Sequence, residues 1–267
     1  MRRIWITESE QEALDFEKFK ASKQPVLWQP DLSAAAPYGF DQIRCDFNGV
    51  KLNTPSDEAG ANLSVVTLDG GPVIRHFAQV GPGGFRSQAG IWSWKHPEIA
   101  AQLSQGVILS YQVKFDQVLR AGDTYSWRNL GDIHSSNKDG TNRAYTGLNL
   151  ATDGSMRVYL AWLGQYFHVN PASDFSSIPL PVGRWPELKI EFIWSEQPTT
   201  IRFWIDEQLA IEQSGVITRL PGHESVEFYP AKLYGASPAG HEPWNQNPMI
   251  QHTRNIKLLG RGLQTVS

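Results

Sequence analysis

Hydrophobic and polar residues alternate along much of this chain, in short runs that end at glycine-containing turns. Between residues 188 and 194 every second position is apolar, whereas Lys189 and Glu191 occupy positions between them, which is the period of a β-strand with one buried face. The same alternation, or a continuous β-branched run, predicts about thirteen strands, at residues 43–50, 62–68, 73–79, 85–94, 107–115, 125–134, 144–150, 156–162, 166–169, 188–194, 201–205, 226–234 and 252–259.

The turns between these runs indicate hairpins. Glycine supplies the positive φ of such turns at Asp69-Gly70-Gly71, at residues 81–84, at Asp139-Gly140 and at Asp153-Gly154. Helical periodicity is confined to residues 8–20 and 97–103, so a parallel βαβ fold is disfavoured. We therefore expect an all-β protein, a jelly-roll β-sandwich of two curved antiparallel sheets. It would form one domain over residues 1–267, with residues 1–40 as an N-terminal extension packed on it.

Composition narrows the classes of function. The 267 residues include 24 Lys and Arg against 27 Asp and Glu, a net charge of −3, which argues against a general nucleic-acid binder. Ten tryptophans agree with a strand-rich core. The sequence contains neither an apolar run long enough for a membrane span nor an N-terminal export signal. The single cysteine, Cys45, excludes an internal disulfide and is expected to be a small buried residue.

Three segments carry a resemblance at the level of the fold. They are Gly183-Arg184-Trp185, the strand 203–206 (Phe-Trp-Ile-Asp) and the closing strand 255–258 (Asn-Ile-Lys-Leu). This hairpin and last strand resemble those of the concanavalin A-like jelly-roll superfamily, which includes lectins, glucanases and polysaccharide lyases. The resemblance implies the fold, and fold alone leaves these activities open.

Three further segments resemble, in the same order, motifs of the alginate-lyase and heparinase-type jelly rolls. The segment 85–88 (Phe-Arg-Ser-Gln) has Gln88 where the family has Glu, and the segment 130–134 (Leu-Gly-Asp-Ile-His) has Asp132 where the family has Gln. The segment 228–234 keeps the final Tyr234 of the third motif but not its Lys and Gly. The resemblance implies a polysaccharide lyase that cleaves a uronic-acid-containing polymer by β-elimination, and a secreted or periplasmic location.

Such an elimination needs a partner for the uronate carboxylate, a base for the C5 proton and an acid for the leaving oxygen. Arg86 and Gln88 share one strand face and offer a guanidinium and an amide to the carboxylate. His134 is the candidate base, because imidazole titrates near neutral pH. Asp132, on the same strand face as His134, would orient the imidazole or contribute to a metal site.

Tyr234 is the candidate general acid, or the acid and base together. Lys232 lies on the same strand face and would supply a cation beside the phenol. Tyr166 is the competing tyrosine. A polyanionic substrate also needs local positive charge, for which the candidates are Arg75, Arg86, Lys95, Arg128 and Arg143.

Strand parity divides the tryptophans into two groups. Trp92 and Trp94 have the parity of Arg86 and would line a sugar-binding groove, and Trp244 would close one end of it from a loop. The expected core tryptophans are Trp127, Trp194 and Trp204.

Two other functions stay open. The first is a non-catalytic carbohydrate-binding jelly roll, with Gln88 and Asp132 as traces of lost chemistry. The second is a glycoside hydrolase, which is disfavoured because no strand carries a suitable pair of carboxylates; Asp206 and Glu207 are adjacent and point apart. The expected partner is an acidic polysaccharide or oligosaccharide, with no nucleic acid or membrane. No cofactor is required, although a structural Ca²⁺ is conceivable.

Overall fold

The computed structural model describes residues 24–81, 83–118, 127–137, 143–150, 157–163, 175–236 and 247–261. Its strands are β1 (Val26–Trp28), β2 (Gln42–Phe47), β3 (Val50–Lys51), β4 (Ala61–Leu68), β5 (Gly71–Ala78), β6 (Phe85–Trp92), β7 (Val107–Lys114), β8 (Trp127–Ser136), β9 (Ala144–Leu150), β10 (Arg157–Leu163), β11 (Phe175–Pro179), β12 (Glu187–Phe192), β13 (Thr199–Ile205), β14 (Gln208–Val216), β15 (Ser225–Ala236) and β16 (Met249–Gly260). The helical elements are the 3-10 helix η1 (Ser93–Lys95) and the α-helix α2 (Pro97–Gln102).

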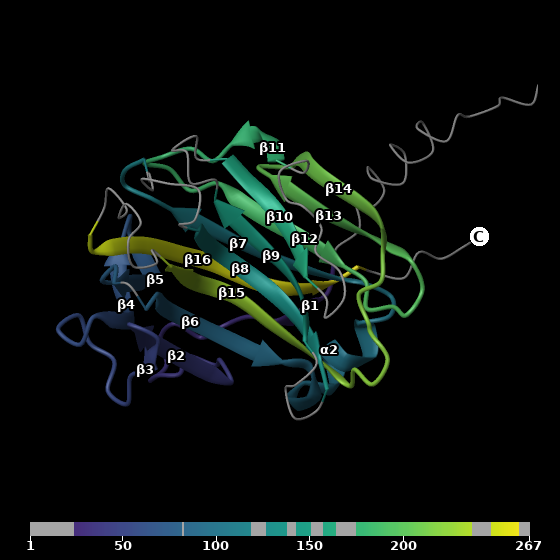
Figure 1. The fold of residues 1–267 in the computed structure, drawn as a ribbon, viewed down its shortest axis with the longest axis horizontal. Coiled ribbons are helices and arrows are strands. Elements are labelled where there is room, and N and C mark those ends of the chain that lie inside the picture. Colours follow the sequence, from purple (N-terminus) through teal and green to yellow (C-terminus); the bar gives the residue numbers. More distant parts are fainter. Residues whose placement is uncertain are drawn as a thin grey trace, which may run out of the picture.

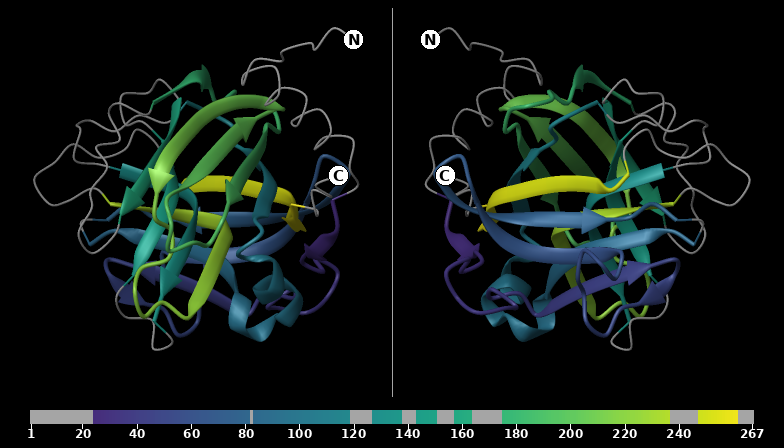
Figure 2. Two further views of the ribbon diagram at one scale, coloured as in Figure 1. Left: turned by 90° about the vertical axis from the view of Figure 1, so that its right-hand side faces the viewer. Right: turned by 90° about the vertical axis from the view of Figure 1, so that its left-hand side faces the viewer.

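These strands form two antiparallel sheets of eight strands each. Sheet A has the order β14-β13-β12-β7-β16-β5-β4, and β1 also pairs with β16. Sheet B has the order β11-β10-β9-β8-β15-β6-β2-β3. The two sheets lie face to face (Figures 1 and 2). The predicted jelly-roll β-sandwich is therefore confirmed.

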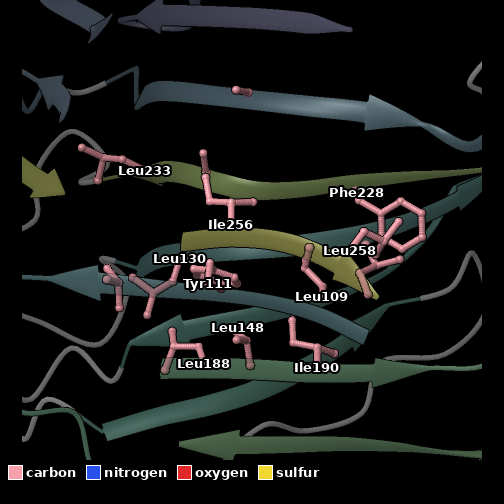
Figure 3. Packing of buried hydrophobic residues seen from close by; sticks show 14 of the residues in the cluster. Leu109, Tyr111, Leu130, Leu148, Leu188, Ile190, Phe228, Leu233, Ile256 and Leu258 are labelled. Carbon is pink, nitrogen blue, oxygen red and sulfur yellow. The ribbon is translucent and has the colours of Figure 1, made fainter. Parts of the chain in front are cut away.

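The core lies between the two sheets, because each contributes the apolar side of its alternating strands. Figure 3 shows this packing. Sheet A contributes Leu109, Tyr111, Leu188, Ile190, Ile256 and Leu258, and sheet B contributes Leu130, Leu148, Phe228 and Leu233. Burial of this apolar surface is the main force that holds the sandwich together. It also fixes which side chains of sheet B must face away from the core.

Several hairpins use the turn chemistry expected from the sequence. Asp69 and Gly70 join β4 to β5 with φ values of 50° and 81°, the paired left-handed conformations of a type I′ turn. Asp206 and Glu207 join β13 to β14 with φ values of 48° and 68°. Asp206, which was expected at the end of a strand, therefore lies with Glu207 in the turn after it. Asp206 accepts hydrogen bonds there from the backbone of Glu187 and from Arg184.

The N-terminal segment from residue 24 contacts the sandwich through β1 and through an edge-to-face contact between Trp28 and Phe40, whose ring centroids are 5.1 Å apart. Strands β1, β11 and β14 were not predicted, and the single strand predicted at 43–50 is divided into β2 and β3 by a turn at Asn48 and Gly49. The predicted helix at 8–20 and the predicted strand at 166–169 lie outside the described residues. The predicted helix near 97–103 is confirmed as α2. No helix in the described part of the chain has the length and hydrophobicity needed to cross a membrane.

Candidate active site

Strands β6, β15 and β8 are neighbours in sheet B (Figure 1). The face that they turn away from the core carries a polar patch. Cross-strand partners lie on the same face of a sheet. The register pairs Glu227 with His134 and Tyr229 with Asp132, and then Lys232 with Gln88 and Tyr234 with Arg86. The polar patch consists of Arg86, Gln88, Asp132, His134, Glu227, Tyr229, Lys232 and Tyr234.

An irregularity in β15 brings both halves of this strand to the patch. Phe228 pairs with Ile91 and Ala231 with Ala89, so two residues, Tyr229 and Pro230, stand opposite one residue of β6. This is a β-bulge, and proline suits it because its missing N–H is not needed in the ladder. Tyr229 and Lys232 consequently share a face, although simple alternation would separate them.

Asp132 is the centre of the patch. Its Oδ2 atom lies 3.1 Å from Nε2 of His134 and accepts a hydrogen bond from Nζ of Lys232. The side chains of Asp132 and Lys232 are only 4% and 3% exposed. Burial alone would raise the pKa of Asp132, but the positive charges of His134 and Lys232 hold it well below its usual value. Burial also lowers the pKa of Lys232, although Asp132 opposes this effect.

His134 lies between two carboxylates. Its Nε2 faces Asp132 and its Nδ1 lies 3.7 Å from Oε2 of Glu227, and the side chain is 15% exposed. Burial disfavours the imidazolium, but Asp132 and Glu227 outweigh it and raise the pKa of His134 above its ordinary value. The site therefore favours the protonated ring. This is the acid form, whereas the base role expected from the sequence needs the neutral form.

Glu227 connects the patch to a second tyrosine and an arginine. The hydroxyl of Tyr229 donates a 2.5 Å hydrogen bond to Glu227, and Nη2 of Arg143 lies 3.8 Å from the same carboxylate. Burial would raise the pKa of Glu227, but His134 and Tyr229 lower it below its usual value. Burial and the nearby Glu227 raise the pKa of Tyr229. Both carboxylates of the patch are therefore held in the ionised form.

Arg86 and Tyr234 form the other end of the patch. The guanidinium carbon of Arg86 lies 4.3 Å from the centre of the Tyr234 ring, and Nζ of Lys232 lies 5.0 Å from it. Arg86 also approaches Asp46 at 3.5 Å. Gln88 is buried beside Lys232 in the register. Arg86, Tyr234, Lys232, Asp132 and His134 thus form one continuous series of contacts across three strands.

Of the two strand tryptophans predicted to line the groove, Trp92 lies on sheet B and Trp94 does not. Trp92 is the last residue of β6 and pairs with Glu227. Trp94 lies in η1, so its predicted place on the strand is wrong: β6 ends two residues earlier, because Ser93 begins a 3-10 turn. The two indoles nevertheless stack, with centroids 5.7 Å apart and planes 13° from parallel.

Other predicted residues take different places. Arg128 is fully buried between the sheets, where it bonds Met249 and Gln251. Arg75 is in β5 of sheet A, where it pairs with Asp57. Neither side chain can add positive charge to the patch, because Arg128 lies between the sheets and Arg75 belongs to the other sheet. Tyr166, Trp244 and the side chain of Trp127 lie outside the described residues.

The two remaining tryptophans have structural positions. Trp194 packs against the core and donates a hydrogen bond from Nε1 to Oγ of Ser135, 2.8 Å away. Trp204 is buried, but it pairs with Lys189 and alternates with the core residues Phe203 and Ile205, so it lies on the other face of sheet A. Its predicted position in the core is therefore wrong.

Sequence reasoning missed Glu227 and Tyr229. In a regular strand they would have the parity of Leu233 and point into the core, opposite to Lys232 and Tyr234. The available signal was Pro230 in the middle of the strand predicted at 226–234, because proline inside a strand indicates a bulge or an edge. Among the described residues, no group of three or more His, Cys, Asp or Glu is arranged to hold a metal ion.

The fold has relatives among solved structures. The endo-β-1,4-glucuronan lyase from the fungus Trichoderma reesei superposes with a TM-score of 0.55 at 14% identity, covering 83% of this chain and 91% of that chain. LamAcat from Zobellia galactanivorans superposes with a TM-score of 0.53 at 11% identity, covering 90% and 99%. These similarities establish the fold. The sequence matches no protein-family model, and a comparison with curated proteins finds no match either.

Proposed function

We propose that this protein is a carbohydrate-active enzyme that cleaves a uronate-containing polysaccharide by β-elimination. The observation that supports this most directly is the continuous series of contacts from Arg86 through Tyr234, Lys232 and Asp132 to His134 on one sheet face. It gathers cations and proton-transfer groups where a polyanionic chain would lie. The sequence resemblance and the fold shared with a glucuronan lyase point in the same direction.

In the proposed reaction, Arg86 and Gln88 bind the carboxylate of the reacting uronate. Removal of the C5 proton places negative charge on that carboxylate, and a guanidinium fixed in advance stabilises it. The C4–O4 bond then breaks, a double bond forms between C4 and C5, and O4 takes up a proton. The step needs no redox partner.

We assign both proton transfers to Tyr234. Its phenolate takes the C5 proton and the resulting phenol gives that proton to O4, which regenerates the phenolate. The cations of Arg86 and Lys232 both contact this ring. His134 contributes positive charge as the imidazolium that Asp132 and Glu227 favour. Tyr234 transfers both protons from one side of the sugar ring. The mechanism therefore suits uronates whose C5 proton and O4 lie on the same side of the ring, such as β-1,4-linked glucuronate.

Glycoside hydrolysis is a poorer match to this patch. A glycoside hydrolase that uses a pair of carboxyl groups needs one of them to have a raised pKa, so that this group can donate a proton. The two carboxylates of the patch, Asp132 and Glu227, both have lowered pKa values, and the proton donors are His134 and the tyrosines.

A non-catalytic carbohydrate-binding role is the second candidate. One observation favours it: Lys232 and His134 already share the carboxylate of Asp132, which leaves as cations for a substrate Arg86, itself 3.5 Å from Asp46, and the more exposed Arg143. Binding to an acidic polysaccharide without any product would support this role.

The test uses purified protein with glucuronan, mannuronate-rich alginate, guluronate-rich alginate and glycosaminoglycans. We expect an ultraviolet-absorbing unsaturated product from the glucuronate or mannuronate polymers. Tyr234→Phe should abolish it, whereas Tyr38→Phe, which removes a phenol from the N-terminal segment, should not. Absence of product from the whole panel, or full activity of Tyr234→Phe, would refute the proposal.

A further inference from the structure

An exposed aromatic platform lies at the end of β6, beside the polar patch. It consists of Trp92, Trp94 and Lys95. Trp94 is 61% exposed, although its ring stacks on that of Trp92. Nζ of Lys95 lies 4.4 Å from the centre of the Trp92 ring and 5.3 Å from that of Trp94. The platform therefore presents flat apolar surface and a positive charge together.

The platform is held rigidly. Asp41 accepts a 2.7 Å hydrogen bond from the backbone N–H of Trp92, and its other oxygen lies 3.5 Å from Nζ of Lys95. The hydroxyl of Ser93 accepts a 2.9 Å hydrogen bond from the backbone of Val226 in β15. These contacts fix η1 and the end of β6 to Asp41, which precedes β2, and to β15. A binding surface organised in this way loses little conformational entropy when a ligand binds.

The position of the platform relates it to the proposed reaction. Glu227 pairs with Trp92 on one side and with His134 on the other, so Trp92 and His134 lie two strands apart on one face. Two strand spacings amount to about 10 Å. Trp92 also lies along β6 from Arg86, roughly 20 Å away for six strand residues. A polysaccharide that runs from Arg86 along β6 would reach this platform.

We infer that the platform is a subsite for an acidic pyranose of the same polymer, beyond the residue that reacts. This inference rests on the proposed function. Flat aromatic rings bind the C–H face of a sugar, and Lys95, with 34% of its side chain exposed, is available to the carboxylate of a uronate. Within the described residues Asp41 is its acidic partner, at 3.5 Å, a distance that leaves Lys95 able to bind a second carboxylate.

The experiment measures binding of glucuronate di- and hexasaccharides by calorimetry, with every variant made in the Tyr234→Phe background to prevent cleavage. Trp94→Ala should weaken hexasaccharide binding by roughly 2- to 10-fold, the range expected for one aromatic stacking contact, and should leave disaccharide binding unchanged. Trp94→Phe should retain most of the affinity. Lys95→Met should reduce the preference for glucuronate over neutral glucose hexasaccharides.

Leu209→Ala is the matched control, because Leu209 is another exposed apolar residue, 50% exposed on β14 of sheet A. If Trp94→Ala binds the hexasaccharide as tightly as the control, the subsite is refuted while the proposed function stands. An equal loss for the disaccharide would also refute it, because that result indicates a contact to the reacting residue. If the parent protein binds no acidic oligosaccharide, the proposed function and the subsite both fail.

Discussion

The substitution Asp132→Asn tests the electrostatic account of the polar patch. It keeps the size of the side chain but removes the charge that holds Lys232 and His134. Lys232 is 3% exposed, so water cannot replace the lost partner. Removing one member of a buried ion pair costs roughly 3–5 kcal/mol. We expect about 3 kcal/mol, near the lower end, because the amide oxygen still accepts a hydrogen bond from Lys232.

The measurement is the free energy of unfolding from urea denaturation at pH 7, with Lys232→Met and the double variant completing a cycle. The double variant should be no less stable than Asp132→Asn alone, because it no longer buries an uncompensated ammonium group. Asp57→Asn is the control: its partner Arg75 lies 2.9 Å away in an ion pair open to solvent, and the expected change is below about 1 kcal/mol.

The pH dependence of this difference follows from the sign of the shift. The pKa of Asp132 is lowered in the folded state, so its contribution is present above the unfolded pKa and is lost as the pH falls. The stability difference between wild type and Asp132→Asn should therefore narrow below about pH 4. The reasoning would be refuted if the free energy of unfolding of Asp132→Asn at pH 7 lay within about 1 kcal/mol of that of the wild type, as expected for the exposed control. It would also be refuted if the changes caused by Asp132→Asn and Lys232→Met simply added in the double variant.

Three further predictions concern other groups. If His134 acts as an imidazolium with a raised pKa, kcat/KM on a cleaved polymer should fall above about pH 6.5 relative to kcat/KM of His134→Gln, and a ratio of the two that rises there would make His134 the base instead. Tyr229→Phe removes the hydrogen bond to Glu227 and should cost roughly 1.5–3 kcal/mol in urea unfolding, and an unchanged midpoint would contradict this. Cys45 is buried and burial raises its pKa to about 12, so a disulfide reagent at neutral pH should label it only after denaturation; stoichiometric labelling of the native protein would contradict this.

The sequence was sufficient for the fold because the apolar period of two is preserved in most strands. In β12, Leu188 and Ile190 face the core as their spacing predicts. The same parity correctly placed Asp132 with His134, and the structure brings both together with Lys232. These predictions are local, and each depends on one uninterrupted strand.

The errors arise where a strand is interrupted. Trp94 lies beyond the end of β6, and the alternation of residues 85–94 gave no sign of the 3-10 turn at Ser93. Arg128 is charged, yet it is buried between the sheets, where it donates a hydrogen bond to Met249. Its location depends on packing between sheets, which no local pattern contains. Glu227 was missed because the bulge at Pro230 reverses the parity of β15.

That bulge affects how related chains should be compared. A relative whose β15 has the same number of residues but no bulge would keep Glu227 facing outward, turn Lys232 and Tyr234 into the core and turn Leu233 out of it. A relative that lacks one residue at Pro230 would instead alternate regularly and keep Lys232 and Tyr234 on the outer face. A one-residue gap at this position is therefore compatible with the same patch, and an ungapped alignment without the bulge is not.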